Sequence, residues 1–457
     1  MDKLKRLTER GYFPAQLPPA FHTTTFANEC NSLLPVAQRH QPLRSRPEQY
    51  SVARVGHERR AIQIPNPASM LMVSSVISQN WQHIQRHYNK TRISISRPKF
   101  QSDNSRATDI TALQDLSKEK LLRSKGYKFV LVTDISKFYY SIYTHSIPWA
   151  LHGKEIAKRD RRPSASMYGN TINQEVRNGQ DGQTVGLPIG PDTSHIIAEC
   201  IASAVDKEMK DKLNFWPDSF RHVDDYFLFF KSEEEAKKAL GILSDSLRKY
   251  ELQINSQKTN IYAAVHIPDE SWADRLKNFE IPNDTERQAS AIRQYFSLAF
   301  SEATSHSDEN VMKYAINRIS AFIIKHQNWK LFEAFLIRAT MRYPNTLQSV
   351  SRILWTYKYY NYAIDQNALQ RMVNSLIEDA AVLNRHSEIV WSSWIALSHN
   401  LRLETRTARQ VETLDSSVCA LLLLEMDKRG LVKRGLNKEF WKRFCNKEGL
   451  YSNMWLL

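Results

Sequence analysis

KFVLVTDI (residues 128–135) and FRHVDDYFLFF (residues 220–230) decide the fold of this chain. Both runs are rich in β-branched and aromatic residues, which is the composition of strands buried in one sheet. Asp134 stands near the end of the first run, and Asp224 and Asp225 lie inside the second. Because uncompensated charges are costly to bury, these carboxylates require a counter-charge, most simply a divalent metal ion.

Segments of helical character follow each region of strand. Residues 194–213 carry apolar side chains at helical spacing, and residues 232–250 open with Ser232 and a run of acids, which suit the N-terminus of a helix. The order of strand, helix, strand and helix predicts a sheet with helices packed on one face.

The N-terminal part combines proline-rich and basic segments. Residues 11–67 are rich in proline and basic side chains, which predicts irregular segments and short strands rather than long helices. Residues 35–100 contain eleven Arg or Lys against two acids, Glu48 and Glu58. This stretch is therefore the best candidate for contacting phosphates.

The second half of the chain has almost no residues that break helices. Residues 242–429 contain no glycine, and from residue 283 onward the only proline is Pro344. Residues 311–326 and 329–343 show apolar side chains at three- and four-residue spacing. The pattern predicts an all-helical region from residue 283 to the end.

Composition limits the class of protein. The chain has 457 residues, 42% of them apolar, and a formal net charge of +15 with a pI near 9.5. It can bury a substantial core, and its charge favours a polyanionic partner such as nucleic acid. Its four cysteines have no spacing that suits zinc, so we expect reduced thiols. They are Cys30, Cys200, Cys419 and Cys445.

The start of the chain and its longest apolar run bear on export and membrane insertion. The start, MDKLKRLTERGYFP, has no apolar targeting region, and the longest apolar run, residues 418–424, is too short to cross a bilayer. We expect neither export nor membrane insertion. The chain stops at MWLL (residues 454–457), an apolar end that predicts either packing or a truncated continuation.

The three aspartates suit one particular chemistry. A lone Asp or a DD pair is more often a solvated turn or a helix cap, but nucleotidyl transfer needs two Mg²⁺ ions bridged by carboxylates. Adjacent residues of a strand point to opposite sides, so Asp224 and Asp225 must occupy a tight hairpin if both are to approach metal. On that ground we expect Asp224 to bind more directly than Asp225.

The remaining motifs resemble those of reverse transcriptases and stand in the same order. DISKFYYSI (134–142) is similar to motif A, and GLPIGPDTS (186–194) is similar to motif B, with Ile189 in place of Gln and His195 in place of the final Pro. HVDD (222–225) resembles the Y-x-DD box, and LQINSQKT (252–259) resembles motif D. Upstream, ERRAIQIPNP (58–67) resembles a fingers segment of the intron and retron enzymes.

This resemblance implies a role for each matching residue. Two Mg²⁺ ions, for which Mn²⁺ can substitute, are expected at the three aspartates and the adjacent Ile135. Tyr139 packs under the sugar and excludes a 2′-hydroxyl. Arg60, Lys258 and, as a weaker candidate, Arg54 are expected to contact the phosphates of the nucleotide. Alternatively, Lys258 is an ordinary surface lysine and the two arginines only solvate a β-hairpin. Motif B is carried by Gly190 and Ser194.

Further stretches resemble one branch of the family, the bacterial abortive-infection and related defence reverse transcriptases. They are GYFPAQLPPAF (11–21), SIYTHSIPWALHG (141–153) and GLPIGPDTSHIIAE (186–199). The resemblance implies a bacterial, cytoplasmic enzyme of antiphage defence that joins dNTPs into DNA, often as a homo-oligomer. In several members synthesis needs no conventional template and starts from a protein hydroxyl; YKYYNY (357–362) offers tyrosines for that role.

The fold class expected on this basis is α+β, with the fingers and palm of a right-hand polymerase. An N-terminal segment with fingers occupies residues 1–125, with the fingers core at about 35–125. The palm, an antiparallel sheet on helices, occupies residues 126–282 and contains motifs A to D. A helical-repeat domain that replaces the thumb occupies residues 283–457.

Three alternatives remain beside the defence polymerase. A conventional RNA-templated reverse transcriptase would use the same site. A degenerate polymerase fold would serve as a non-catalytic, RNA-binding scaffold, which the retention of all three aspartates disfavours. A nucleotide cyclase also uses two metals beside strand aspartates, but the chain lacks a GGDEF-like turn.

Overall fold

The computed structural model describes residues 1–442 except 41–43, 55, 57, 103–104, 111–115, 268–270 and 307. Cys445 and the terminal MWLL lie outside the described residues. The chain forms two compact units. The first contains residues 1–14, 22–47 and 63–269, and the second contains residues 15–21, 48–62 and 270–457.

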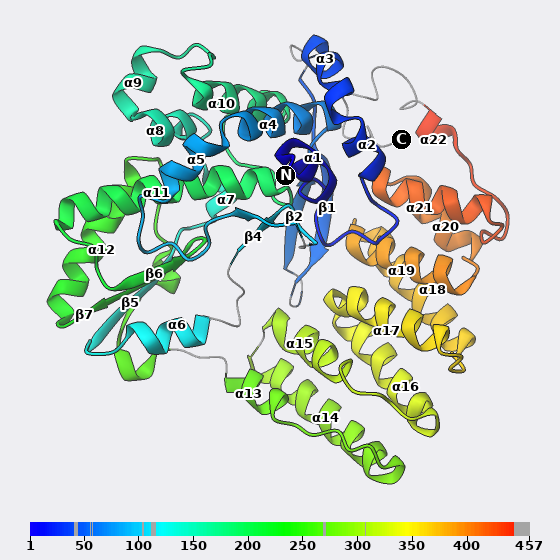
Figure 1. Cartoon of the computed structure of the whole chain (residues 1–457). Helices are drawn as coiled ribbons and strands as arrows, with labels where there is room; N and C mark the ends of the chain where they lie inside the picture. The colour runs from blue at the N-terminus through cyan, green and yellow to red at the C-terminus, as the bar shows by residue number, and fades with distance from the viewer. Residues whose placement is uncertain are drawn as a thin grey trace. The chain divides into compact units, whose positions relative to one another are not determined.

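The first unit is built around a four-stranded sheet (Figure 1). Its strands are β6 (Ser219–His222), β7 (Asp225–Phe230), β5 (Phe129–Asp134) and β8 (Asn260–Ala263), in that order across the sheet. All neighbours are antiparallel, and the register sets Asp134 opposite Asp225. The two predicted runs therefore form neighbouring strands of one sheet, as expected from their composition.

Both faces of this sheet are apolar. Leu131, Leu228 and Phe230 join the main core with helices α11 (Asp192–Leu213) and α12 (Glu233–Arg248). A smaller cluster on other strand positions comprises Val130, Phe220, Phe227 and Phe229, against which Leu116 of α6 (Leu116–Arg123) packs. Successive strand residues point to opposite faces, so helices contribute to the packing on both sides and not on one face alone.

Helix α12 begins where its sequence predicts. The Ser232 hydroxyl accepts the Glu235 N–H at 3.2 Å, and the Glu235 carboxylate accepts the Ser232 N–H at 3.3 Å. This reciprocal pair satisfies two backbone donors at the end of the helix.

The N-terminal segment is more helical than its prolines suggest. Helix α3 (Cys30–His40) contains Pro35 in its interior, where a proline removes a hydrogen bond and normally breaks the helix. Cys30 and Ala37 are buried in a cluster with residues of α1 (Lys3–Arg10) and α4 (Pro67–Gln79). Tertiary packing offsets the cost of the proline, which the local sequence could not reveal.

The first unit has further short elements around this core. They are α2 (Thr24–Asn28), α5 (Trp81–Tyr88), β3 (Lys99–Phe100), β4 (Thr108–Asp109), α7 (Phe138–Ser141), α8 (Ser146–His152), α9 (Lys154–Arg159), α10 (Tyr168–Asn178), η2 (Ser256–Lys258) and η3 (Ala264–His266).

The second unit joins a strand pair to a series of helices. Strands β1 (Glu48–Ala53) and β2 (Arg59–Ile64) form a two-stranded sheet, and β1 packs against α19. Most of this strand pair thus belongs with the helices, although it comes from the stretch expected to form the fingers. The helical region follows the predicted pattern, with α15 ending at Ile319, before the expected residue 326.

The helices from α13 to α19 each pack against the next helix but one, which gives two rows that can be followed in Figure 1. The first row runs from α13 through α15, α17 and α19 to α21, and the second runs from α14 through α16 and α18 to α20. The bounds are α13 (Ser271–Lys277), α14 (Thr285–His306), α15 (Glu309–Ile319), α16 (His326–Arg342), η4 (Pro344–Thr346), α17 (Leu347–Tyr359), α18 (Gln366–Val382), α19 (His386–His399), α20 (Thr405–Glu412), α21 (Ser417–Lys428) and α22 (Glu439–Lys442).

Within the part of the chain that the structure describes, no helix combines the length and the apolar character needed to cross a membrane.

Candidate active site

A tight hairpin between β6 and β7 carries the paired aspartates. His222 and Asp225 pair across the two strands, so Val223 and Asp224 form the two-residue turn. Val223 has a φ of 57°, which is a rare conformation for a β-branched residue. Its N–H donates to the Ser96 hydroxyl at 2.7 Å, and its carbonyl accepts from Arg221 Nη1 at 2.7 Å. The strained turn is therefore held from both sides.

The register brings the third aspartate to this turn. Asp134 and Asp225 are directly opposed across β5 and β7, so their side chains share one face of the sheet. Asp224 follows the bend of the turn, and its carbonyl accepts the N–H of Ile135 at 3.2 Å. Ile135 itself is 1% exposed. The hairpin that the sequence argument required is present, and it brings Asp225 as well as Asp224 near Asp134.

Burial and mutual repulsion govern the charges of this site. Burial, and after it the neighbouring carboxylates of Asp225 and Asp134, together raise the pKa of Asp224 to about 7. Burial also raises the pKa of Asp225, against the attraction of Lys258. Lys258 Nζ lies 2.8 Å from Asp134 Oδ2, and this hydrogen bond raises the pKa of the lysine. The site holds more negative charge than one lysine neutralises.

The donors at this site fit a divalent cation. Asp134 Oδ1 is buried and accepts no hydrogen bond from any described residue. The described residues nevertheless include no group of three or more His, Cys, Asp or Glu side chains arranged to hold a metal ion. Carboxylate oxygens are the ligands that Mg²⁺ prefers, so the chemistry of the site fits that ion.

Tyr139 is connected to the rest of the site through residues that the sequence argument did not assign. Its hydroxyl forms a 2.9 Å hydrogen bond with His195 Nδ1, and His195 Nε2 lies 3.1 Å from the Ser96 carbonyl. The backbone carbonyl of Tyr139 accepts the Leu187 N–H at 2.8 Å. Burial and then Asp224 raise the pKa of Tyr139, which keeps the hydroxyl protonated. The histidine in place of the usual motif B proline was the available signal for this contact.

An unassigned arginine holds the loop of motif B. Gly190 has a φ of 137°, where residues with a side chain are strained, and its carbonyl accepts from Arg106 Nη2 at 2.9 Å. Arg106 also pairs with Asp192, whose other carboxylate oxygen accepts the Thr108 N–H at 3.0 Å. Ser194 is 4% exposed and lines an internal cavity of about 20 Å³. Its side chain therefore faces the protein interior.

A second unassigned arginine, Arg221, supports the turn formed by Val223 and Asp224. It is fully buried and forms salt bridges at 2.9 Å with both Glu199 and Asp206. Asp206 also accepts hydrogen bonds from Thr91 and Tyr226. Although burial alone would raise the pKa of Glu199, Arg221 holds it below its usual range. Position 221 precedes the HVDD motif, but nothing in the sequence indicates its two partners.

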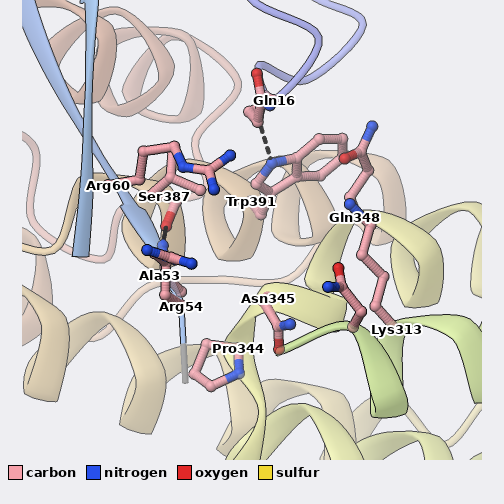
Figure 2. Close-up of a pocket in the computed structure, with 12 residues that line it drawn as sticks. Gln16, Ala53, Arg54, Arg60, Lys313, Pro344, Asn345, Gln348, Ser387 and Trp391 are labelled. Atoms are coloured by element: carbon pink, nitrogen blue, oxygen red, sulfur yellow. Dashed lines mark hydrogen bonds between the residues drawn. The ribbon is translucent and has the colours of Figure 1, made fainter. Parts of the chain in front are cut away.

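Two of the three cations expected at the nucleotide phosphates, Arg54 and Arg60, lie in the second unit. Arg54 and Arg60 line a pocket of about 90 Å³, to which α15 adds a third cation, Lys313 (Figure 2). The amides of Asn345 and Gln348 also face this pocket.

The pocket walls are tied together by hydrogen bonds of the second unit. Trp391 Nε1 donates to the Gln16 carbonyl at 2.8 Å, and the Ser387 hydroxyl accepts the Ala53 N–H at 3.1 Å, as Figure 2 shows. Of the predicted residues, the structure thus brings the aspartates, Lys258, Tyr139 and Gly190 into one unit and groups Arg54 with Arg60 in the other.

The antiparallel sheet with three carboxylates at one end defines a polymerase palm. Residues 64–303, more than half of the 457-residue chain, match the family model "Reverse transcriptase (RNA-dependent DNA polymerase)". The chain belongs to the reverse transcriptase family, and its family activity is that of an RNA-directed DNA polymerase. No protein of curated function matches the chain.

Two solved structures of telomerase are similar to the chain. The telomerase of Candida albicans in complex with a TWJ fragment of telomeric RNA has 13% identity and a TM-score of 0.34, over 82% of this chain and 69% of that chain. The apo telomerase of Candida tropicalis has 11% identity and a TM-score of 0.35, over 94% of this chain and 76% of that chain.

Proposed function

We propose that this chain is a defence-associated reverse transcriptase of the abortive-infection type that makes DNA at Asp134, Asp224 and Asp225. The observation that carries the proposal is the gathering of these carboxylates at one end of the palm sheet, with Asp134 Oδ1 buried and lacking a hydrogen bond from the described residues. Buried, mutually repelling carboxylates favour a bound cation over an empty site.

The three aspartates, with Ile135 beside them, would hold two Mg²⁺ ions, or Mn²⁺ in their place, which activate the attacking hydroxyl and stabilise the leaving pyrophosphate. The Lys258 side chain is 67% exposed beyond its contact with Asp134, so it is free to reach an incoming phosphate. Tyr139, fixed through His195, would exclude a 2′-hydroxyl, and Gly190 would allow close approach of the nucleotide.

The other predicted nucleotide contacts divide into two kinds. Arg54 and Arg60 remain candidates for binding phosphate, because they share a pocket with a third cation, Lys313. For Ser194 we propose a supporting role beneath motif B, because its burial leaves little surface for a ligand.

The defence assignment concerns the rest of the chain. The two rows of packed helices support a helical-repeat domain, from about residue 283, in place of a thumb. Within YKYYNY, Tyr359 and Tyr360 are 68% and 64% exposed, so each offers a hydroxyl as a protein primer. The proposed partners are dNTPs, a DNA product, RNA and further copies of the chain.

The test is to incubate the purified chain with each dNTP, separately and together, without nucleic acid and with Mg²⁺ or Mn²⁺. We expect DNA that remains attached to protein until protease treatment. Dependence on added RNA would instead favour a conventional RNA-templated enzyme, the candidate that the family match supports. Salt-sensitive RNA binding without synthesis would favour the scaffold.

A further inference from the structure

A large cavity in the first unit lies apart from the catalytic turn. It has a volume of about 880 Å³ and is lined mainly by residues of α8, α9 and α10 and of the segments that connect them, with further residues such as Val185 and Glu251 from outside this group. Figure 1 shows these three helices grouped together. None of the three aspartates lines this cavity. Its size is in the range of cavities that bind small molecules.

The charged side chains of this cavity are mostly cations. Lys154, Lys158, Arg161 and Arg177 line it, and Glu251 is the single carboxylate among its lining residues. Lys154 Nζ lies 3.9 Å from Glu251 Oε1 and 4.1 Å from the centre of the Trp149 ring. An excess of three positive charges around one cavity favours a phosphorylated ligand.

Two buried polar atoms in the wall lack a partner among the described residues. Asn173 is 8% exposed, and its Oδ1 accepts no hydrogen bond, although its Nδ2 lies 3.1 Å from His145 Nδ1. Burial lowers the pKa of His145, which leaves this ring nitrogen neutral and able to accept. Four residues along α10, Arg177 Nε is also buried and donates to no described residue.

These two atoms form a matched pair. Residues four apart in a helix lie on the same side, so Asn173 and Arg177 stand next to each other in the wall of the cavity. An unsatisfied buried polar group destabilises the folded protein, so a ligand that satisfies both atoms recovers that cost. A nucleobase edge or a sugar hydroxyl carries the required donor and acceptor side by side.

We propose that this cavity binds a phosphorylated nucleoside, either as a free nucleotide or as one unit of a single strand, at a site separate from the catalytic aspartates. Lys154, Lys158 and Arg161 contact the phosphate, and Asn173 and Arg177 contact the base or sugar. None of the three aspartates lines this cavity, so the inference goes beyond the proposed function.

The first test measures binding in EDTA, which suppresses metal-dependent binding at the aspartates. The probes are fluorescent dATP and a labelled oligo-dT of about eight nucleotides, read by anisotropy with the full chain. Lys158→Glu is compared with Lys238→Glu, which makes the same charge change at an exposed position of α12 in the same unit. We expect Lys158→Glu to weaken binding of at least one probe about tenfold or more, with little effect of the control.

The two probes identify the source of the nucleotide. Selective loss of dATP binding assigns the cavity to free nucleotides, and selective loss of oligo-dT binding assigns it to a strand. Equal weakening by Lys158→Glu and Lys238→Glu, or no change with either, overturns the proposal, because general charge would then explain all binding.

A second variant tests recognition of the base or sugar. Asn173→Ala removes the unpartnered acceptor, and we expect weaker binding together with less discrimination among the four dNTPs. Unchanged affinity and discrimination in a variant with normal thermal unfolding would overturn the assignment of Asn173. Asp224→Ala with Asp225→Ala should retain this binding, so failure of the catalytic proposal is distinguishable from failure of this one.

Discussion

The turn that carries Asp224 and the buried network around Arg221 differ in how completely their charges are neutralised. Arg221 is fully buried, but two carboxylates and a backbone carbonyl satisfy its guanidinium. The aspartates at the turn are also largely buried, yet Lys258, which pairs with Asp134, is mostly exposed. A buried charge that is fully neutralised by its neighbours therefore supports the fold, whereas a buried carboxylate that is only partly neutralised is available to bind a cation.

The largest effect should come from removing the undercompensated charges. Asp224→Ala with Asp225→Ala should reduce dNTP incorporation roughly a thousandfold or more, because the site loses two of its three carboxylates. The same change relieves repulsion, so the free energy of unfolding should not fall. Incorporation of labelled dNTP and urea denaturation measure the two quantities.

Asp211→Ala is the matched control for this double variant, because Asp211 is an exposed carboxylate of the same unit. Activity of the double variant equal to that of the control would remove the catalytic assignment. A large loss of stability would show that these carboxylates support the fold, as the charges of the Arg221 network do.

Removing the compensated charge should act on stability. Arg221→Met leaves Glu199 and Asp206 buried without their cation, so we expect the free energy of unfolding to fall by about 3 to 5 kcal/mol. Arg248→Met removes an exposed ion pair and should change it by no more than about 0.5 kcal/mol. Similar urea midpoints for both variants would show that burial does not determine how much this network contributes to the free energy of unfolding.

Glu48 extends the comparison to the second unit, because hydroxyls rather than a cation satisfy this buried carboxyl. Ser416 and Ser417 donate to it at 2.9 and 2.7 Å, and burial raises its pKa to about 7. A raised pKa means that the folded state binds the proton more tightly. The resulting stability is present below the unfolded pKa of 4.5 and is lost as the pH rises through 7.

Glu48→Gln, which stays neutral, should remove this pH dependence. Between about pH 5 and pH 8 the wild-type chain should lose up to about 3 kcal/mol of unfolding free energy relative to the variant. Denaturant unfolding at several pH values measures the difference. Parallel curves for the two proteins would indicate that Glu48 titrates normally in the folded chain.

The smallest effect concerns the link between Tyr139 and His195. Tyr139→Phe should keep the ring that excludes a 2′-hydroxyl and cost about 1 kcal/mol of stability through the lost hydrogen bond. Tyr139→Ala should relax discrimination against ribonucleotides. Incorporation ratios for dNTP and NTP measure this, and discrimination that is unchanged in the alanine variant would contradict the proposed role of the ring.

Local pattern was sufficient for much of the fold and for the aspartates. The strand runs, the start of α12 at Ser232 and the helical second half follow from side chains that are neighbours along the chain. The interior helix with Pro35 was not predictable in this way, since its stability depends on packing against residues far along the chain.

Local composition alone indicated that three aspartates lie in or beside two buried runs and that the chain carries the motifs of a reverse transcriptase. Only the tertiary structure decided that Asp225 opposes Asp134, that Lys258 occupies one of its oxygens, and that Arg221 is enclosed by two acids. The physical reason is the separation along the chain of the residues that interact. Strand composition and helix caps depend on residues a few positions apart, whereas these ion pairs and the register join residues that only the folded chain brings together.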